Sequence, residues 1–352
     1  MLTCNNYVGI DLHKKFSQIA VINQEGKVIE EKRINNNREE LSVFFNNLKH
    51  SSKGVVEASG SWYWFVDMLK EIDFDITLAH PFKVKAIASA KIKTDKVDAR
   101  ILGNLLRADL IPMSYIPSKK ELEQRELLRF RFSLSQQKTR NKNQIHSILT
   151  KYNIAYTGRS DLFGKGGREF LRSQKDLPSH CQLFVLEYLE LIESIETKIK
   201  NIDKQIDAEI KLDKSLKLLL TIPGVGPYTA YLLKAEIGDI NRFPDDHHLC
   251  SCMGLVPSTY QSGNTMYHGH ITKRGNSTVR WALVQAAQVA VRKEGYLKDV
   301  YLDISRRRGK QKAKVAIARR ILSSAYFVLT RNQPYFKPNN QEHLSGPKRP
   351  LG

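Results

Sequence analysis

Four acidic residues in the first 100 positions have a type and spacing suited to holding a metal ion: Asp11, Glu57, Asp95 and Asp98. Asp11 and Glu57 each follow a short apolar run, so each carboxylate is expected at the end of a buried strand. Asp95 and Asp98 are three positions apart behind Thr94, a residue that can cap a helix, and would share one face of its first turn. Mg²⁺ and Mn²⁺ accept carboxylate oxygens, and two such ions can stabilise both the attacking and the leaving oxygen of a phosphodiester displacement. The set therefore predicts a site for Mg²⁺ or Mn²⁺ that acts on a phosphodiester.

The elements that must position these carboxylates form an α/β pattern. Strands are expected at residues 7–11, 17–23, 28–34, 55–57 and 76–79, and helices at 38–48 and 62–72. Three strands joined by hairpins, followed by strands separated by helices, predict a mixed sheet and a ribonuclease-H-like fold for residues 1–115. A single acidic residue at a strand end or in a first helical turn is ordinarily structural, because it solvates a loop or complements the helix dipole. The order of all four along this pattern favours metal binding.

The spacing of apolar residues becomes helical from residue 116 to 215. Between Ile192 and Ile206 they recur at alternating steps of three and four, as in a coiled-coil seam. One amphipathic helix packed on its own domain would give the same spacing, but the charged flanks of the seam favour helical pairing, within or between chains. A mostly α-helical domain is expected at 216–330, and a proline-containing disordered tail at 331–352.

The domain that starts at 216 carries a second group of residues that could act on phosphates. Gly224 and Gly226 lie in a segment that resembles a helix-hairpin-helix element, whose turn amides can face a phosphate, although a plain αα-hairpin is equally compatible. Two polar loops with glycines follow, at 254–264 and 269–276. A serine in these loops, near basic side chains, could attack a phosphodiester, since cations stabilise the developing charge. The alternative for a Ser-Gly pair is an ordinary turn.

The charge of the chain indicates a polyanionic partner. The net charge is +20, with 56 Lys and Arg against 36 Asp and Glu. Arg129 to Lys151 contains six basic residues and no acidic one, and Arg306 to Arg320 contains eight and none. A solvated helix face is the alternative, but neutralised phosphates release counterions and favour binding of nucleic acid. The predicted nucleic-acid-binding residues are Arg129, Arg131, Lys138, Arg140, Lys142, Gly224, Gly226, Lys273, Arg274, Arg280, Arg306, Arg307 and Arg308.

The sequence indicates a cytoplasmic protein without a membrane partner. It has no run of 18 apolar residues, no basic and apolar signal sequence at its start, and four cysteines that form no disulfide framework. The group His247, His248, Cys250 and Cys252 lacks the paired ligand spacing of a zinc site.

In this order, the motifs resemble the DEDD transposases of bacterial insertion sequences, the family of the Piv invertase and the bridge-RNA-guided recombinases. The resemblance covers nearly the whole chain and rests on segments 9–11, 56–60, 94–99, 222–226, 254–258 and 273–276. It implies a domain like that of the resolvase RuvC, in which Asp11, Glu57, Asp95 and Asp98 form the catalytic tetrad. It also implies a C-terminal transposase domain whose nucleophilic serine maps onto Ser262, with Ser258 as the competing candidate.

The same resemblance implies how the protein would work. Family members attach DNA to the serine, exchange strands through a junction intermediate, and complete one active site from two protomers of a homo-oligomer, a dimer or tetramer. A structured bridge RNA pairs with the double-stranded DNA of the element ends and of the target. Two other functions compete: a Holliday-junction-type nuclease without a covalent step, and a non-catalytic nucleic-acid-binding protein. The loops from Gly254 to Asn276 argue against the first, and the complete tetrad argues against the second.

Overall fold

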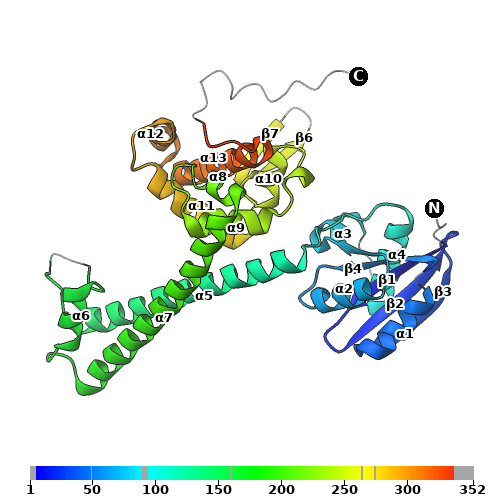
Figure 1. Ribbon diagram of the computed structural model, residues 1–352, viewed down its shortest axis with the longest axis horizontal. Coiled ribbons are helices and arrows are strands. Elements are labelled where there is room, and N and C mark those ends of the chain that lie inside the picture. Colours follow the sequence, from blue (N-terminus) through cyan, green and yellow to red (C-terminus); the bar gives the residue numbers. More distant parts are fainter. Residues whose placement is uncertain are drawn as a thin grey trace. The chain divides into compact units, whose positions relative to one another are not determined.

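The computed structural model describes residues 5–48, 50–88, 94–158, 161–262, 265–272 and 275–336, except for the side chains of 259–262, 265, 266 and 268. The chain divides into two compact units, Met1–Ile116 and Pro117–Gly352. Figure 1 labels most of the helices and strands of both.

The first unit is built on a five-stranded mixed sheet, as the alternating pattern predicts. Its strands are β1 (Asn6–Leu12), β2 (Phe16–Asn23), β3 (Val28–Asn35), β4 (Ser52–Glu57) and β5 (Ile76–Ala79). They lie in the order β3-β2-β1-β4-β5. The first three pair antiparallel through short connections, whereas β4 runs parallel to both β1 and β5. The carboxyl ends of β1 and β4 therefore meet at the same edge of the sheet.

Helices cover both faces of this sheet (Figure 1). The helices α1 (Arg38–Leu48) and α2 (Trp62–Glu71) share one core cluster with Val8, Ile10 and Val56. The helices α3 (Pro81–Ile87) and α4 (Asp95–Arg107) share another cluster with Val55. Because side chains alternate along a strand, residues 9 and 11 of β1 and residues 55 and 57 of β4 face α4. Both predicted strand-end carboxylates are thus on the α4 face.

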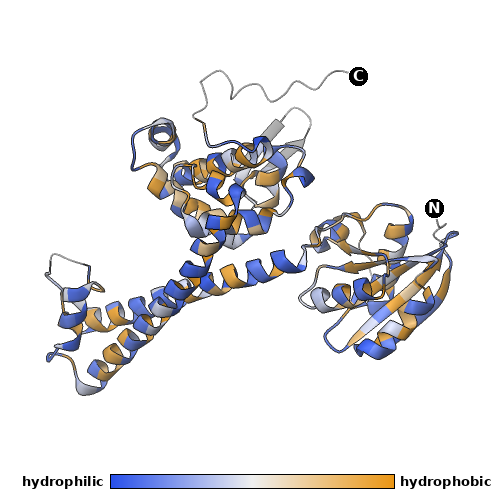
Figure 2. Ribbon diagram, viewed as in Figure 1, coloured by the Kyte–Doolittle hydropathy of each residue, from blue (hydrophilic) through white to orange (hydrophobic). Residues whose placement is uncertain are grey.

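The second unit begins with two long antiparallel helices, α5 (Lys119–Lys151) and α7 (Ser179–Leu212), joined through the short α6 (Lys165–Arg172) (Figure 1). The predicted isoleucine seam is buried along α7 and packs on α5 of the same chain. Arg131 pairs with Asp203, and Lys138 pairs with Glu196. Lys138 follows Arg131 by seven positions on α5, whereas Glu196 precedes Asp203 by seven positions on α7. This spacing gives the antiparallel register. In Figure 2 hydrophobic residues lie along the facing sides of the two helices.

A helical bundle follows the pair. It comprises α8 (Lys214–Leu219), α9 (Pro227–Ile237), a 3₁₀ turn (Ile240–Arg242), α10 (Asp246–Cys252), α11 (Ser277–Ala290), α12 (Tyr296–Arg308) and α13 (Lys310–Arg331). The last helix is central to the core, since Ile317, Ile321 and Leu322 are fully buried. None of the described helices in either unit is both long and apolar enough to cross a membrane.

Two sequence expectations for this bundle need correction or completion. The predicted loops at 254–264 and 269–276 contain a two-stranded antiparallel ribbon, β6 (Pro257–Ser262) and β7 (Thr265–Ile271). Both strands contain threonine and tyrosine, which favour strands, and Tyr260 is paired with Tyr267 in the register. Glycine punctuation concealed this signal. In the predicted tail, the Tyr335 amide donates to Thr221 Oγ1 at 2.7 Å, while residues 337–352 lie outside the described residues.

Candidate active site

The register of the sheet places two of the predicted carboxylates side by side. Ile10 of β1 is paired with Val56 of β4 in parallel register, and Asp11 and Glu57 are the next residues on each strand. Both side chains are partly buried on the α4 face. Neighbouring parallel strands are about 4.8 Å apart, so their carboxylates can share one cation. The two strand ends thus form one wall of the site.

A backbone contact between β1 and α4 brings in the other two carboxylates. A Cβ atom on Gly9 would lie 1.9 Å from the carbonyl oxygen of Ala99 and 2.5 Å from the nitrogen of Gly103, so only glycine allows α4 to pack this closely. Asp95 lies one helical turn before Ala99, at the end of α4 that approaches the carboxyl end of β1. As predicted, the helix starts with Thr94 as its cap, whose Oγ1 accepts from the Val97 amide at 3.3 Å.

The resulting cluster contains a residue that the sequence analysis overlooked, His13. Its Nε2 atom lies 3.1 Å from Asp11 Oδ2 and 3.3 Å from Asp95 Oδ1. The donor atoms of these three side chains lie within 4.8 Å of one another, and none of the three is fully buried. The spacing Asp-x-His puts both side chains on one side of an extended chain, and this pattern could have identified His13 from the sequence. A search for carboxylates alone passes over it.

The electrostatics of Asp11 fit a bound cation. Burial raises the pKa of the Asp11 carboxyl, the neighbouring charges of Asp95 and Asp98 add to that rise, and His13 acts in the opposite direction. Burial and nearby negative charge disfavour the ionised form of this carboxylate, and a bound cation would favour it. Oxygen and imidazole donors at these spacings fit a divalent metal ion. Asp98 and Glu57 are outside the three-residue group, but Asp98 is close enough to affect Asp11.

The two candidate serines lie on β6 in the second unit. The Ser258 hydroxyl donates to the His270 carbonyl at 3.2 Å, and its Oγ lies 2.4 Å from where a Cβ on Gly269 would stand, so it helps to hold the ribbon together. Ser262 is the last residue of β6, and its side chain is not among those described. Lys273 and Arg274 lie outside the described residues.

Other predicted phosphate-binding residues of the bundle have structural contacts. Arg280 donates to the carbonyls of Gly275 and Met253 at 2.7 and 3.3 Å, and burial lowers the pKa of its guanidinium. Gly224 has a φ of +84°, and a Cβ there would lie 2.2 Å from the Ala286 carbonyl, so this glycine is needed for the turn to pack on α11. A Cβ on Gly226 would meet open space.

The basic residues of α5 mostly have acidic or aromatic partners within the second unit. Arg129 pairs with Glu236 at 3.0 Å, and Arg131 makes two hydrogen bonds to Asp203. Lys138 lies 3.8 Å from Glu196, and Lys142 lies over the ring of Phe163. The partners come from distant segments, so a local count of charges overlooked them. These cations are therefore less available to phosphates than the sequence indicated.

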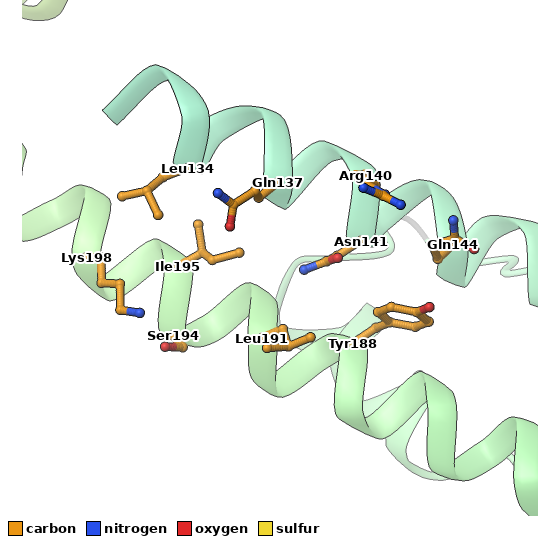
Figure 3. A pocket seen from close by; sticks show the side chains of 10 residues that line it. All are labelled: Leu134, Gln137, Arg140, Asn141, Gln144, Tyr188, Leu191, Ser194, Ile195 and Lys198. Atoms are coloured by element: carbon orange, nitrogen blue, oxygen red, sulfur yellow. The ribbon is translucent and has the colours of Figure 1, made fainter. Parts of the chain in front are cut away.

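Among the five predicted nucleic-acid-binding residues of α5, Arg140 is the exception, because it has neither an ion pair nor an aromatic contact in the described part of the chain. It lines a solvent-open groove of about 500 Å³ between α5 and α7. Figure 3 shows that the labelled side chains come from both helices and include Gln137, Asn141 and Gln144 from α5 and Tyr188 and Lys198 from α7.

The exposed cations gather instead at the turn between α12 and α13. This cationic turn comprises Arg306, Arg307, Arg308, Lys310 and Lys312, all exposed. Within the described residues none of them forms an ion pair with a carboxylate. Gly309, with a φ of +85°, allows the chain to reverse between the two helices. The structure thus presents five cations of the second predicted basic segment to solvent.

Comparisons with known proteins match both units. A family model of the DEDD IS110 type, described as "Transposase", matches residues 8–154, and the model "Transposase IS116/IS110/IS902 family" matches 216–302. The chain is 26% identical over 290 residues to a Pseudomonas aeruginosa protein named "Probable family 20 transposase", covering 81% of this chain and 84% of that one. It is also 26% identical to the transposase for insertion sequence element IS1111A of Coxiella burnetii, covering 93% and 90%. The transposase for IS1328 of Yersinia enterocolitica is 23% identical, covering 82% and 85%. The chain therefore belongs to the DEDD transposases of insertion sequences.

Proposed function

We propose that this transposase cleaves DNA strands with a Mg²⁺- or Mn²⁺-dependent site formed by Asp11, Glu57, Asp95 and Asp98. The observation that carries the proposal is the approach of Asp95 to Asp11 and His13, which the backbone contact at Gly9 enforces. The strand order β3-β2-β1-β4-β5 supports a ribonuclease-H-like fold of the RuvC type for this unit. In such a site the four carboxylates hold the cation, which when bound stabilises negative charge on phosphate oxygens.

The experiment that tests this step is strand cleavage by the full-length protein on the DNA ends of its own element. Asp11→Asn removes a ligand charge while preserving shape, so cleavage should be lost and binding of the DNA retained. Glu71→Gln is the matched control, because Glu71 is an exposed carboxylate of the same unit that pairs only with Arg38 in the described chain. Cleavage that persists in excess EDTA or in Asp11→Asn would overturn the proposal.

In the proposed reaction, strand cleavage itself is covalent. Ser262 Oγ attacks the phosphorus and the bond from phosphorus to the leaving deoxyribose oxygen breaks. The serine proton passes through solvent or a nearby base to that oxygen, which leaves as a hydroxyl. The new phosphoserine ester conserves the energy of the broken bond, so an incoming deoxyribose hydroxyl can displace the serine and rejoin the strand. The position of Ser262 at the end of β6 and the family resemblance support this assignment, whereas the Ser258 hydroxyl already bonds the His270 carbonyl.

Mass spectrometry of a trapped protein and DNA adduct tests the serine step. A nucleotide attached to Ser262, and loss of the adduct in Ser262→Ala, are the expected results. A nucleotide on Ser258 would move the assignment. Full recombination by Ser262→Ala would remove this serine from the reaction.

The proposed partners are double-stranded DNA at the element ends and target, a bridge RNA, and further copies of this chain. The cationic turn supports a polyanionic partner, because within the described residues none of its five exposed cations forms an ion pair with a carboxylate. Sequencing the RNA that copurifies with the protein tests the RNA proposal, and a discrete transcript from beside the gene is the expected result. Light scattering of the same preparation measures the oligomer, which we expect to be a dimer or tetramer.

A further inference from the structure

Both the backbone and the ring of His13 have specific contacts with neighbouring residues. Its backbone amide donates to the Phe16 carbonyl at 3.0 Å, and its own carbonyl accepts from Asn36 Nδ2 at 2.7 Å. The imidazole stacks on the Phe16 ring with centroids 4.7 Å apart, and the guanidinium of Arg33 lies 3.5 Å from the centroid of that ring. These contacts fix the ring with Nε2 directed at Asp11 and Asp95.

The distances around Nε2 match those between ligands of one metal ion. In an octahedral site with bonds of about 2.1 Å, adjacent ligand atoms are about 3.0 Å apart. Nε2 lies 3.1 Å from Asp11 Oδ2 and 3.3 Å from Asp95 Oδ1. Both distances are close to this edge length, and the three donor atoms all lie within 4.8 Å of one another.

We propose that His13 is a nitrogen ligand of the catalytic cation and that it makes this site prefer Mn²⁺ to Mg²⁺. Mg²⁺ is a hard ion that is bound through oxygens, whereas imidazole favours transition metals. A site of four carboxylates alone gives Mn²⁺ little advantage, so the histidine shifts the preference. The inference rests on the proposed metal-dependent function and specifies the ligand set of that site.

Pulsed electron paramagnetic resonance of the full-length protein loaded with Mn²⁺ tests the ligand directly. A histidine ligand produces a ¹⁴N modulation, which should change to that of ¹⁵N when the protein is labelled with ¹⁵N-histidine. The modulation should disappear in His13→Gln and persist in His50→Gln. His50 is an exposed histidine that precedes the amino end of β4, the opposite end of that strand from Glu57. The labelling result needs no variant, so misfolding of His13→Gln cannot decide it.

Competition between the two ions tests the preference. In His13→Gln, we expect affinity for Mn²⁺ to fall by about tenfold or more and affinity for Mg²⁺ to fall less. Bound Mn²⁺ that depends on Asp11 but shows no histidine modulation in the wild type would overturn the role of His13 and leave the proposed function standing. An equal loss of affinity for both ions would overturn the preference. Failure of the wild type to bind Mn²⁺, or binding unaffected by Asp11→Asn, would instead overturn the metal-dependent function itself.

Discussion

Replacing Gly9 by alanine should disable the active site without changing any catalytic side chain. The added Cβ would stand 1.9 Å from the Ala99 carbonyl oxygen. Carbon and oxygen atoms in close contact are normally about 3.3 Å apart, so α4 must retreat from β1 by about 1.4 Å. Asp95 belongs to the same helix, one turn away, and its carboxylate retreats by a similar distance from Asp11.

Both the rate and the stability should respond to this movement. Displacing a catalytic group by about 1 Å can reduce a rate about 100-fold, and we expect a loss of that size in strand cleavage. Overpacking typically costs about 1 to 3 kcal/mol, and this contact belongs at the upper end because backbone atoms cannot rotate away. The melting temperature of the first unit should therefore fall by roughly 10 °C.

Two other glycines of the same unit provide a graded comparison. A Cβ on Gly60 would meet nothing within 4 Å, so Gly60→Ala should melt like the wild type. A Cβ on Gly103 would lie 2.8 Å from Ile22 Cδ1, the end of a side chain that can move, so Gly103→Ala should fall between the two. Circular dichroism measures melting, and a gel assay measures cleavage. If Gly9→Ala melted and cleaved like Gly60→Ala, the argument that this contact positions Asp95 would be refuted.

Three further predictions concern charge and exposure. The folded-state pKa of Asp11 is raised, so its protonated form stabilises the metal-free fold at low pH, and this contribution is lost as the pH rises. In EDTA at pH 7, Asp11→Asn should therefore have a higher melting temperature than the wild type, and the difference should shrink toward about pH 4. An unchanged or lower melting temperature would contradict this. Burial raises the pKa of Cys250 to about 11, so iodoacetamide at pH 8 should alkylate the exposed Cys252 and should react with Cys250 only after denaturation. Peptide mass mapping measures both reactions. Equal labelling of the two cysteines in the native protein would contradict the buried position of Cys250. Neutralising Arg306, Arg307 and Arg308 together should make the negative slope of log K against log salt for DNA binding shallower by about 2 to 3. Arg131→Gln should leave this slope unchanged, because the Arg131 guanidinium already binds Asp203. The reverse result would place the DNA-binding surface on α5.

The sequence was sufficient for the features of the first unit that depend on local patterns. Short apolar runs and the turns between them predicted all five strands, and the Thr94 cap and the start of α4 followed from residue types alone. The proximity of Asp95 to Asp11 could be expected only by recognising the order of the motifs. Its physical cause, the close approach at Gly9, is a contact between residues 90 positions apart, which no local pattern contains.

Contacts between distant segments account for what the sequence analysis missed or overstated. Arg129 and Arg131 looked available because their acidic partners, Glu236 and Asp203, are respectively 107 and 72 positions away. His13 was overlooked because its significance comes from Asp95, a residue of another element. The ribbon β6–β7 was hidden by polar and glycine residues, which are also common in loops. In each case the local residue types were compatible with two environments, and tertiary packing selected one.

The ion pairs between α5 and α7 make the length of this helical pair adjustable only in fixed increments. Arg131 with Asp203 and Lys138 with Glu196 are one heptad apart on both helices. Removing seven facing residues from each helix would restore the same alignment and bring the α6 end closer to the bundle by about 10 Å, since each residue rises about 1.5 Å. Removing three or four would rotate the isoleucine seam off its partner. Protein engineers could therefore change the length of the α5–α7 helical pair by whole heptads while preserving the hydrophobic clusters at its two ends.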